Sequence, residues 1–208
     1  MILEFGFRNL IFWGFRKRRA FRSARHFAAI PKPNTNYNNG GKYPFPLLIF
    51  LWMENTTALF NAARSGDVAA LQNEIGRVSD INTTDDRGYT PLIIACYNGQ
   101  FEAARTLLNA GANVDAADNG GNTALMGVCF KGYPDIAELL LAHGANIDAQ
   151  HGNGGTALMF ATMFGRNELV KLMLENGADR SIREARGLRA IDLAVQQGNV
   201  EAVELLDQ

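Results

Sequence analysis

Two cysteines and three histidines are the side chains of this sequence best suited to bind a transition metal or to act in nucleophilic catalysis. They are Cys96, Cys129, His26, His143 and His151. A zinc site shows in a sequence as Cys or His pairs a few residues apart, which together supply three or four ligands. These five residues form no such pairs, so we expect neither a metal nor any other cofactor.

Two glycine-rich stretches, NGGNT at 119–123 and GNGGT at 152–156, are similar in composition to phosphate-binding loops. No strand precedes them and no Gly-Lys-Ser/Thr follows, so turns explain them better. The carboxylates of Asp115 and Asp148 recur at turn positions, and others fall on outward-facing helix positions. These are Glu102, Asp135, Glu168 and Glu201. This spacing is typical of a solvated surface and forms no paired acid and base, so we expect no enzymatic activity and no small-molecule substrate.

A period of 33 residues runs from Thr57 to the end of the chain without insertion or deletion. Its clearest trace is GGNTALM at 120–126 followed by NGGTALM at 153–159. A threonine opens four units and an arginine opens the fifth: Thr57, Thr90, Thr123, Thr156 and Arg189. A glycine follows at one phase of every unit: Gly66, Gly99, Gly132, Gly165 and Gly198. A fixed period of this length is the signature of a repeat architecture.

The unit that begins near Thr90 shows what one period encodes. Thr90 suits a helix N-cap, Pro91 is tolerated at the first helical position, and Gly99 ends a helix of about two turns. A second helix with apolar residues at helical spacing follows and ends at Gly111; the next stretch, ANVDAADNGGN, should form a turn. Because one such unit cannot bury its own apolar face, several must stack side by side.

On these residues the unit resembles the ankyrin repeat, most closely over DRGYTPLIIACYNGQFEAARTLLNAGANVDAAD at 86–118. The resemblance implies an all-α fold, an ankyrin-repeat solenoid with a β-turn and two antiparallel helices in each 33-residue repeat. It covers residues 54–208, in five units that we place at about 54–85, 86–118, 119–151, 152–184 and 185–208.

The sequence departs from the family pattern at two points. The family often has histidine after Thr-Pro-Leu, whereas this chain has Ile93, Met126 and Met159, so apolar packing is expected to replace a hydrogen bond. The last unit has Arg189 in place of threonine and Asp192 in place of an apolar residue. Polar residues suit the end of a stack, where the outer face meets water.

The two cysteines lie 33 residues apart and therefore hold equivalent positions in adjacent first helices. Packed helices lie about 8–10 Å apart, whereas the Cα atoms of a disulfide lie within about 7 Å. We expect Cys96 and Cys129 to be separate, reduced thiols in the core, and nothing here indicates an oxidising compartment.

Residues 1–53 lie outside the period and differ in charge. They carry nine Lys or Arg and one Glu, or +8, whereas residues 54–208 carry eleven basic and twenty acidic residues, or −9. We expect them to form a mostly disordered, basic N-terminal extension. Four interpretations stay open: sequence upstream of a true start at Met53, an organelle-targeting segment, a basic tail for a membrane or nucleic acid, and a secretory signal. The apolar run at 45–52 is too short to span a bilayer.

The resemblance also implies where a partner would bind, on the concave face made of the first helices and the turn tips. Two groups of residues lie there: the pair before each helix-ending glycine, and the turn residues before each threonine. Candidate partner-binding residues from these groups are Arg64, Arg87, Tyr89, Tyr97, Asn98, Phe130, Lys131, Met163, Phe164 and Gln196. Tyr97, Phe130 and Met163 would form a ladder across three repeats, unless Phe130 and Met163 instead tuck into neighbouring repeats.

These patterns predict a non-catalytic module for protein–protein interaction, a cytoplasmic and monomeric scaffold, adaptor or regulator. Its partner is another protein, and the acidic repeats favour a basic one. The repeats are not expected to bind nucleic acid, which requires clustered positive charge. The alternative is a tethered adaptor, in which residues 1–53 address a membrane, an organelle or nucleic acid while the repeats bind cargo. Only in that case do we expect membrane contact, or a location in an organelle or outside the cell.

Overall fold

The computed structural model describes the backbone of residues 46–208 and the side chains from Thr56 onward. The four interpretations of the N-terminal extension therefore concern residues that lie mostly outside the described part. Within that part the chain forms ten helices. They are α1 (Pro46–Ser65), α2 (Val68–Ile75), α3 (Pro91–Tyr97), α4 (Phe101–Asn109), α5 (Ala124–Lys131), α6 (Pro134–Ala142), α7 (Ala157–Met163), α8 (Asn167–Glu175), α9 (Ala190–Gln197) and α10 (Val200–Leu206).

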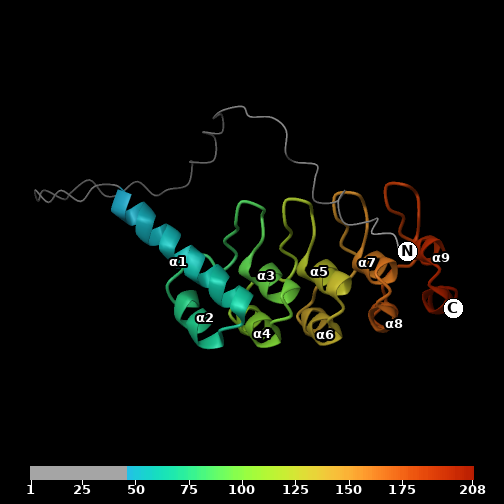
Figure 1. The fold of residues 1–208 in the computed structure, drawn as a ribbon, viewed down its shortest axis with the longest axis horizontal. Coiled ribbons are helices and arrows are strands. Elements are labelled where there is room, and N and C mark those ends of the chain that lie inside the picture. The colour runs from blue at the N-terminus through green and yellow to red at the C-terminus, as the bar shows by residue number, and fades with distance from the viewer. Residues whose placement is uncertain (1–45) are drawn as a thin grey trace, which may run out of the picture. The chain divides into compact units, whose positions relative to one another are not determined.

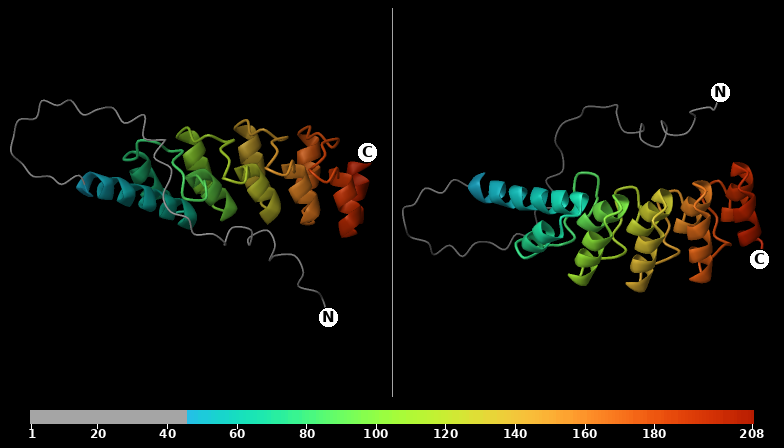
Figure 2. Two further views of the ribbon diagram at one scale, coloured as in Figure 1. Left: turned by 90° about the horizontal axis from the view of Figure 1, so that it is seen from above. Right: turned by 60° about the horizontal axis from the view of Figure 1, so that its bottom comes forward.

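The helices form two layers of a stack, as the period predicted. Helices α3, α5, α7 and α9 pack one on the next, and α4, α6, α8 and α10 form the second layer behind them. Figure 1 shows the two layers, with the turns between repeats projecting beyond the first layer. Figure 2 shows the same helix pairs following one another in sequence order from two further directions. The predicted all-α repeat solenoid is confirmed. We call the layer of α1, α3, α5, α7 and α9 the odd-helix layer and the other the even-helix layer.

Threonine caps open the helices of the odd-helix layer in the three central repeats. The side-chain oxygen of Thr90 accepts the backbone N–H of Ile93 at 3.2 Å. Thr123 and Thr156 accept the equivalent N–H groups at 3.4 Å each. Each cap satisfies one of the backbone donors that have no partner inside the helix. These three threonines are buried, so each helix begins at a fixed depth in the stack.

The core is a ribbon that runs through all the repeats. Leu92, Leu125 and Leu158 hold one phase of the period and are each 1% exposed. The even-helix layer contributes residues of a second phase, Leu107, Leu140 and Met173, which are fully buried. Because each repeat covers the apolar face of the one before it, the buried side chains form one continuous cluster.

Backbone hydrogen bonds join each turn to the next. The N–H of Asn119 donates to the carbonyl of Arg87 at 3.0 Å, and the same bond recurs one repeat later from Gly152 to Gly120 at 2.9 Å. A second series uses side chains: the backbone N–H of Asn146 donates to the Asp115 carboxylate at 2.8 Å. These bonds hold the turns in register, so polar residues of the turns contribute to the stack as well as facing solvent.

Glycine is required at the tip of the first of these turns for two separate reasons. Gly88 has φ of +80°, which side chains other than glycine rarely adopt. A Cβ atom there would also lie 2.7 Å from the backbone nitrogen of Asn119 in the following turn. The same glycine therefore shapes its own turn and lets the next turn approach.

The first repeat differs from the sequence-based expectation. Helix α1 begins at Pro46, so residues 46–53 are helical although they belong to the extension expected to lack regular structure. Thr57 lies inside this helix and does not begin it. The other threonines cap helices because a turn rich in Asn, Asp and Gly precedes them. No such turn precedes Thr57, and the helix continues upstream to a proline, which is tolerated at a helix start.

Candidate functional site

The predicted partner-binding residues lie at the C-terminal ends of the odd-layer helices and in the turns before them. Tyr97 ends α3 and is 44% exposed, and Arg64, Arg87, Asn98 and Gln196 are exposed as well. The other five are half-buried: Tyr89, Phe130, Lys131, Met163 and Phe164. None of the ten is fully buried.

Three aromatic rings from successive repeats form a row on this layer. The rings of Tyr97 and Phe130 stack with centroids 6.1 Å apart and an angle of 7° between their planes. Phe164 meets Phe130 edge-on, with centroids 4.5 Å apart and an angle of 78°. Both arrangements are favourable for aromatic pairs. We call Tyr97, Phe130 and Phe164 the aromatic row.

The aromatic row differs from the predicted ladder in one member. Phe164 contacts Phe130, and Met163 and Tyr89 both pack against the core of the stack. The reason lies in the spacing of the contacts. Phe164 reaches back to the residue 34 positions before it, and Lys131 does the same to Tyr97. The predicted ladder assumed contacts at the 33-residue period alone, which hold for Tyr97 and Phe130.

Two cations lie at the aromatic row. The ammonium of Lys131 lies 4.4 Å from the ring centroid of Tyr97 and 5.9 Å from that of Phe130. Both distances permit attraction between the cation and the π-electrons of the ring. The second cation, Arg166, donates from Nε to the backbone carbonyl of Phe130 at 3.4 Å. Its side chain lies over Gly132, where an added Cβ atom would lie 3.0 Å from the Cδ and Nε atoms of Arg166.

Arg166 was not among the predicted residues because it follows the helix-ending Gly165, whereas the predicted residues precede such a glycine or lie in the turn before a threonine. A signal for it exists at its own phase of the period. One repeat position is held by Gln100, Tyr133 and Arg166, and each of these side chains packs over the glycine that ends the preceding first helix. Gln100 also donates to the carbonyl of Arg64, as Arg166 does to that of Phe130. The side chain at this position therefore contacts the end of the first helix in the preceding repeat.

Comparison with protein families decides which family these repeats represent. A family model described as Ankyrin repeats (3 copies) matches residues 59–151 and again residues 125–208. The chain belongs to the ankyrin-repeat family. Ankyrin repeats generally mediate binding to other proteins, and the family is typically non-catalytic. Among curated proteins, none matches this ankyrin chain.

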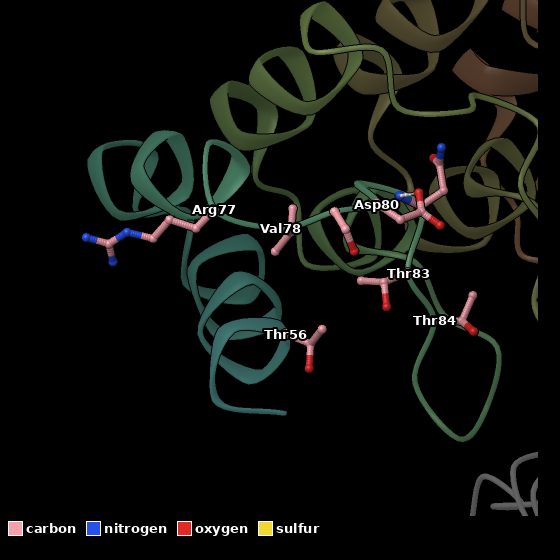
Figure 3. Close-up of a pocket in the computed structure, with 8 residues that line it drawn as sticks. Thr56, Arg77, Val78, Asp80, Thr83 and Thr84 are labelled. Atoms are coloured by element: carbon pink, nitrogen blue, oxygen red, sulfur yellow. Dashed lines mark hydrogen bonds between the residues drawn. The ribbon is translucent and has the colours of Figure 1, made fainter. Parts of the chain in front are cut away.

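Two hollows in the described part of the ankyrin stack both lie in the first repeat. One, of about 400 Å³, lies between α1 and the segment after α2, and polar side chains line most of it (Figure 3). Of its lining residues, Asp80 accepts the backbone N–H of Asn82 at 2.8 Å, and Arg77 pairs with Glu74, outside the lining, at 3.1 Å. The second hollow, of about 550 Å³, includes Arg64 of the predicted binding residues. The aromatic row lines neither hollow.

The residues first considered for metal or nucleophilic chemistry have structural roles in the ankyrin stack. Cys96 and Cys129 are free, fully buried thiols, as predicted, and burial raises the pKa of each to about 12. His143 ends α6, where Nδ1 lies 2.8 Å from the carbonyl oxygen of Leu139. The ring of His151 accepts the backbone N–H of Asn153 at 3.1 Å in a turn. Among the side chains described, from Thr56 onward, no cluster of possible metal ligands occurs. His26 lies outside the described residues.

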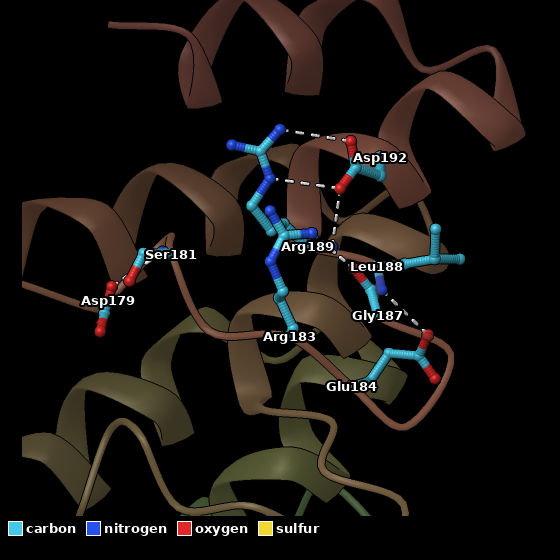
Figure 4. A network of polar contacts seen from close by, with 8 residues as sticks. All are labelled: Asp179, Ser181, Arg183, Glu184, Gly187, Leu188, Arg189 and Asp192. Carbon is cyan, nitrogen blue, oxygen red and sulfur yellow. Dashed lines mark hydrogen bonds and ion pairs between the residues drawn. The ribbon is translucent and has the colours of Figure 1, made fainter.

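A polar network closes the last ankyrin repeat (Figure 4). Arginine at position 189 has no oxygen to cap the helix, and the Asp192 carboxylate instead accepts the Arg189 backbone N–H at 2.9 Å and its Nε at 3.2 Å. These hydrogen bonds from Arg189 lower the pKa of Asp192. Arg183 donates to the carbonyl of Gly187 at 2.6 Å, and Glu184 accepts from Arg186 at 3.1 Å. The start of this helix is thus held by a bond from the N-cap N–H to Asp192, where the central repeats use a threonine oxygen that accepts the N–H three residues further on.

The described helices include none with the length and apolar character needed to cross a membrane.

Proposed function

We propose that this ankyrin stack binds another protein through its odd-helix layer, with the aromatic row at the centre of the contact. The observation that carries the proposal is the position of Tyr97, which is 44% exposed while its ring stacks on Phe130. The phenol is thus held in a fixed orientation at the surface. Rigid aromatic side chains of this kind dominate the binding energy of many protein interfaces.

The size of the surface also supports the proposal. The aromatic row joins three adjacent repeats, from α3 to α7, and the predicted residues Asn98 and Lys131 lie beside it. A specific interface needs about 800 Å² from each partner, which three neighbouring repeats can supply. On this proposal Phe130, Lys131 and Phe164 bind the partner, and Met163 and Tyr89 support them from the core side.

We place this module in the cytoplasm as a monomeric scaffold, adaptor or regulator without catalytic activity. The free thiols of Cys96 and Cys129 suit a reducing compartment. The tethered adaptor remains the alternative, and it depends on residues 1–53. Edman sequencing of the native N-terminus tests it, because a protein that begins at Met53 has no basic tether.

The binding proposal is tested by affinity purification and mass spectrometry with matched variants of the full chain. Tyr97→Ala with Phe164→Ala removes two rings of the row, and Arg105→Ala with Glu138→Ala removes two exposed side chains of the even-helix layer. We expect partners of the wild type to be kept by the even-layer variant and lost from the row variant, while both variants stay folded by circular dichroism. Partners that remain on the folded row variant would show that the aromatic row is not the site.

A further inference from the structure

Acidic residues are unevenly divided between the two layers of the stack. The even-layer helices α2, α4, α6, α8 and α10 carry eight Asp or Glu residues against two Lys or Arg. From Thr56 onward, the odd-layer helices carry one acidic residue, Asp192 in α9, against Arg64 and Lys131. The acidic excess of the helices therefore lies on the layer away from the aromatic row.

The two cations at the aromatic row also differ in their partners from the cations of the even-layer helices. In the even-helix layer, Arg105 forms an ion pair with Glu102, and Lys171 lies 3.8 Å from Glu175. Among the described residues, Lys131 and Arg166 form no ion pair, and their contacts are with aromatic rings and a backbone carbonyl. Their positive charge is therefore available to a ligand, whereas carboxylates already neutralise the charges of Arg105 and Lys171.

The aromatic row and its two cations form one continuous surface. Lys131 lies over the ring of Tyr97, and Arg166 lies at the C-terminal end of α5, where it bonds the carbonyl of Phe130. A ligand that covers the exposed part of Tyr97 therefore also lies next to the positive charge of Lys131 from the following repeat. Attraction between opposite charges orients a partner and excludes partners of the wrong sign.

We propose that the segment bound at the aromatic row is an acidic peptide segment that carries an aromatic or aliphatic side chain, an inference that rests on the proposed function. The apolar side chain packs on Tyr97 and Phe164, and carboxylates pair with Lys131 and Arg166. The net charge of the repeats favoured a basic partner, but the two cations at the aromatic row and the low acidic content of the odd-layer helices favour the opposite sign. Two cations beside an acidic second layer are too few to hold a nucleic acid backbone.

Selection of phage-displayed random dodecapeptides on the immobilised full chain tests this inference. The selected peptides are sequenced, synthesised and titrated against four proteins: wild type, Lys131→Gln with Arg166→Gln, Tyr97→Ala with Phe164→Ala, and the control Arg105→Gln with Lys171→Gln. The control removes the same amount of charge from the even-helix layer. Thermal unfolding confirms that each variant is folded, and the two cation variants are also made singly.

We expect peptides enriched in Asp or Glu around an aromatic or aliphatic residue, with affinity reduced about five- to tenfold by loss of the two row cations and unchanged in the control. Peptides that need Tyr97 and Phe164 but show no acidic enrichment and bind the cation variant equally well overturn the acidic-partner inference and leave the proposed function standing. Peptides that bind all variants alike overturn both. Tighter binding of oligodeoxythymidine than of any selected peptide, lost in the row variant, would instead assign the surface to single-stranded nucleic acid.

Discussion

Glu74 occupies a position that belongs to a core residue in the following repeats. Its equivalents one, two and three periods later are Leu107, Leu140 and Met173, all fully buried. The Glu74 side chain is 12% exposed, and one of its oxygens pairs with Arg77 at 3.1 Å. The other oxygen, Oε2, is buried and has no hydrogen-bond partner among the described residues. A buried carboxylate oxygen without a donor costs more than the surface ion pair returns.

Replacing Glu74 by leucine should therefore stabilise the protein. We expect Glu74→Leu to raise the free energy of unfolding by about 1 kcal/mol and the melting temperature by roughly 2–4 °C. Differential scanning calorimetry measures the change, with Glu138→Leu, at an exposed position of α6, as the control that should leave the melting temperature within about 1 °C. A lower melting temperature for Glu74→Leu would mean that the carboxylate has a partner that stabilises the fold.

His151 gives the stack a pH dependence. It holds the turn position of Asp85 and Asp118, and its ring packs against Phe160 with centroids 5.3 Å apart. Burial lowers the pKa of His151 below its usual value of 6.5, and the carboxylates of Asp118 and Glu184 oppose this without overcoming it. The unfolded chain thus gains a proton before the folded chain does, so stability is present above about pH 6.5 and decreases as the pH falls.

Aspartate at this position should remove that dependence, because Asp85 and Asp118 already accept backbone N–H groups in the equivalent turns. We expect the melting temperature of the wild type to fall between about pH 7.5 and pH 5.5, and that of His151→Asp to fall less. Carboxylates whose pKa is lowered in the folded chain, such as Glu184, also stabilise it, but that contribution decreases only below about pH 4.5, outside this window. Equal slopes for both proteins over this range would exclude His151 as the cause.

At the scale of the element, a comparison of two turn glycines distinguishes the cost of local backbone strain from the cost of disturbing the packing between repeats. Gly88 and Gly187 hold the same turn position and both have φ of +80°. A Cβ at Gly88 would lie 2.7 Å from the backbone nitrogen of Asn119, whereas at Gly187 it meets nothing within 4 Å. The difference arises because a following turn covers the first glycine and none covers the second.

Alanine at the two positions should therefore have unequal effects. We expect Gly187→Ala to cost about 1 kcal/mol, the strain of a left-handed backbone, and Gly88→Ala to cost at least about 1–2 kcal/mol more, because the backbone of the next turn must move. Urea unfolding of the two variants measures the difference. Equal losses would indicate that the turns are not held together as the hydrogen bond from Asn119 to Arg87 requires.

The elements themselves were predictable because each is encoded locally and the code is repeated. A threonine cap, a glycine after the helix and a turn rich in Asn and Gly recur at fixed phase, so Thr90, Thr123 and Thr156 could each be assigned a role that the structure confirms. The start of α1 was not predictable in this way, because residues 46–53 lie outside the period and no turn precedes Thr57.

The candidate site was predictable only in part, for a geometric reason. The period identifies which residues share a position along the stack, and it placed Tyr97 and Phe130 together correctly. It does not specify how far a side chain reaches into the preceding repeat. Phe164 and Lys131 reach back by 34 residues, and Arg166 extends further, to the carbonyl of Phe130. Such diagonal contacts depend on side-chain length and helix ends, which a one-dimensional pattern does not contain.

At the scale of the whole molecule, the stack separates residues that maintain the fold from residues that are available to a partner. The apolar residues of both layers form one buried cluster, and the exposed large hydrophobic side chains are Tyr97, Val195 and Val200 among the residues described. Val195 and Val200 lie in the last repeat, and Val195 holds the phase of Cys96 and Cys129, which a following repeat buries. Tyr97 is exposed in a central repeat, where the end of the stack does not explain its exposure.

Site-specific photo-crosslinking tests the central claim, that the odd-helix layer is the binding surface, most directly. The photoreactive residue p-benzoylphenylalanine is placed at position 97 or 164 on the aromatic row, or at position 105 or 138 on the even-helix layer, and the full chain is irradiated in its native cells. We expect one or more discrete protein adducts from positions 97 and 164, and none of these from positions 105 and 138. The same adducts from the even-helix layer, with none from position 97 or 164, would contradict that claim.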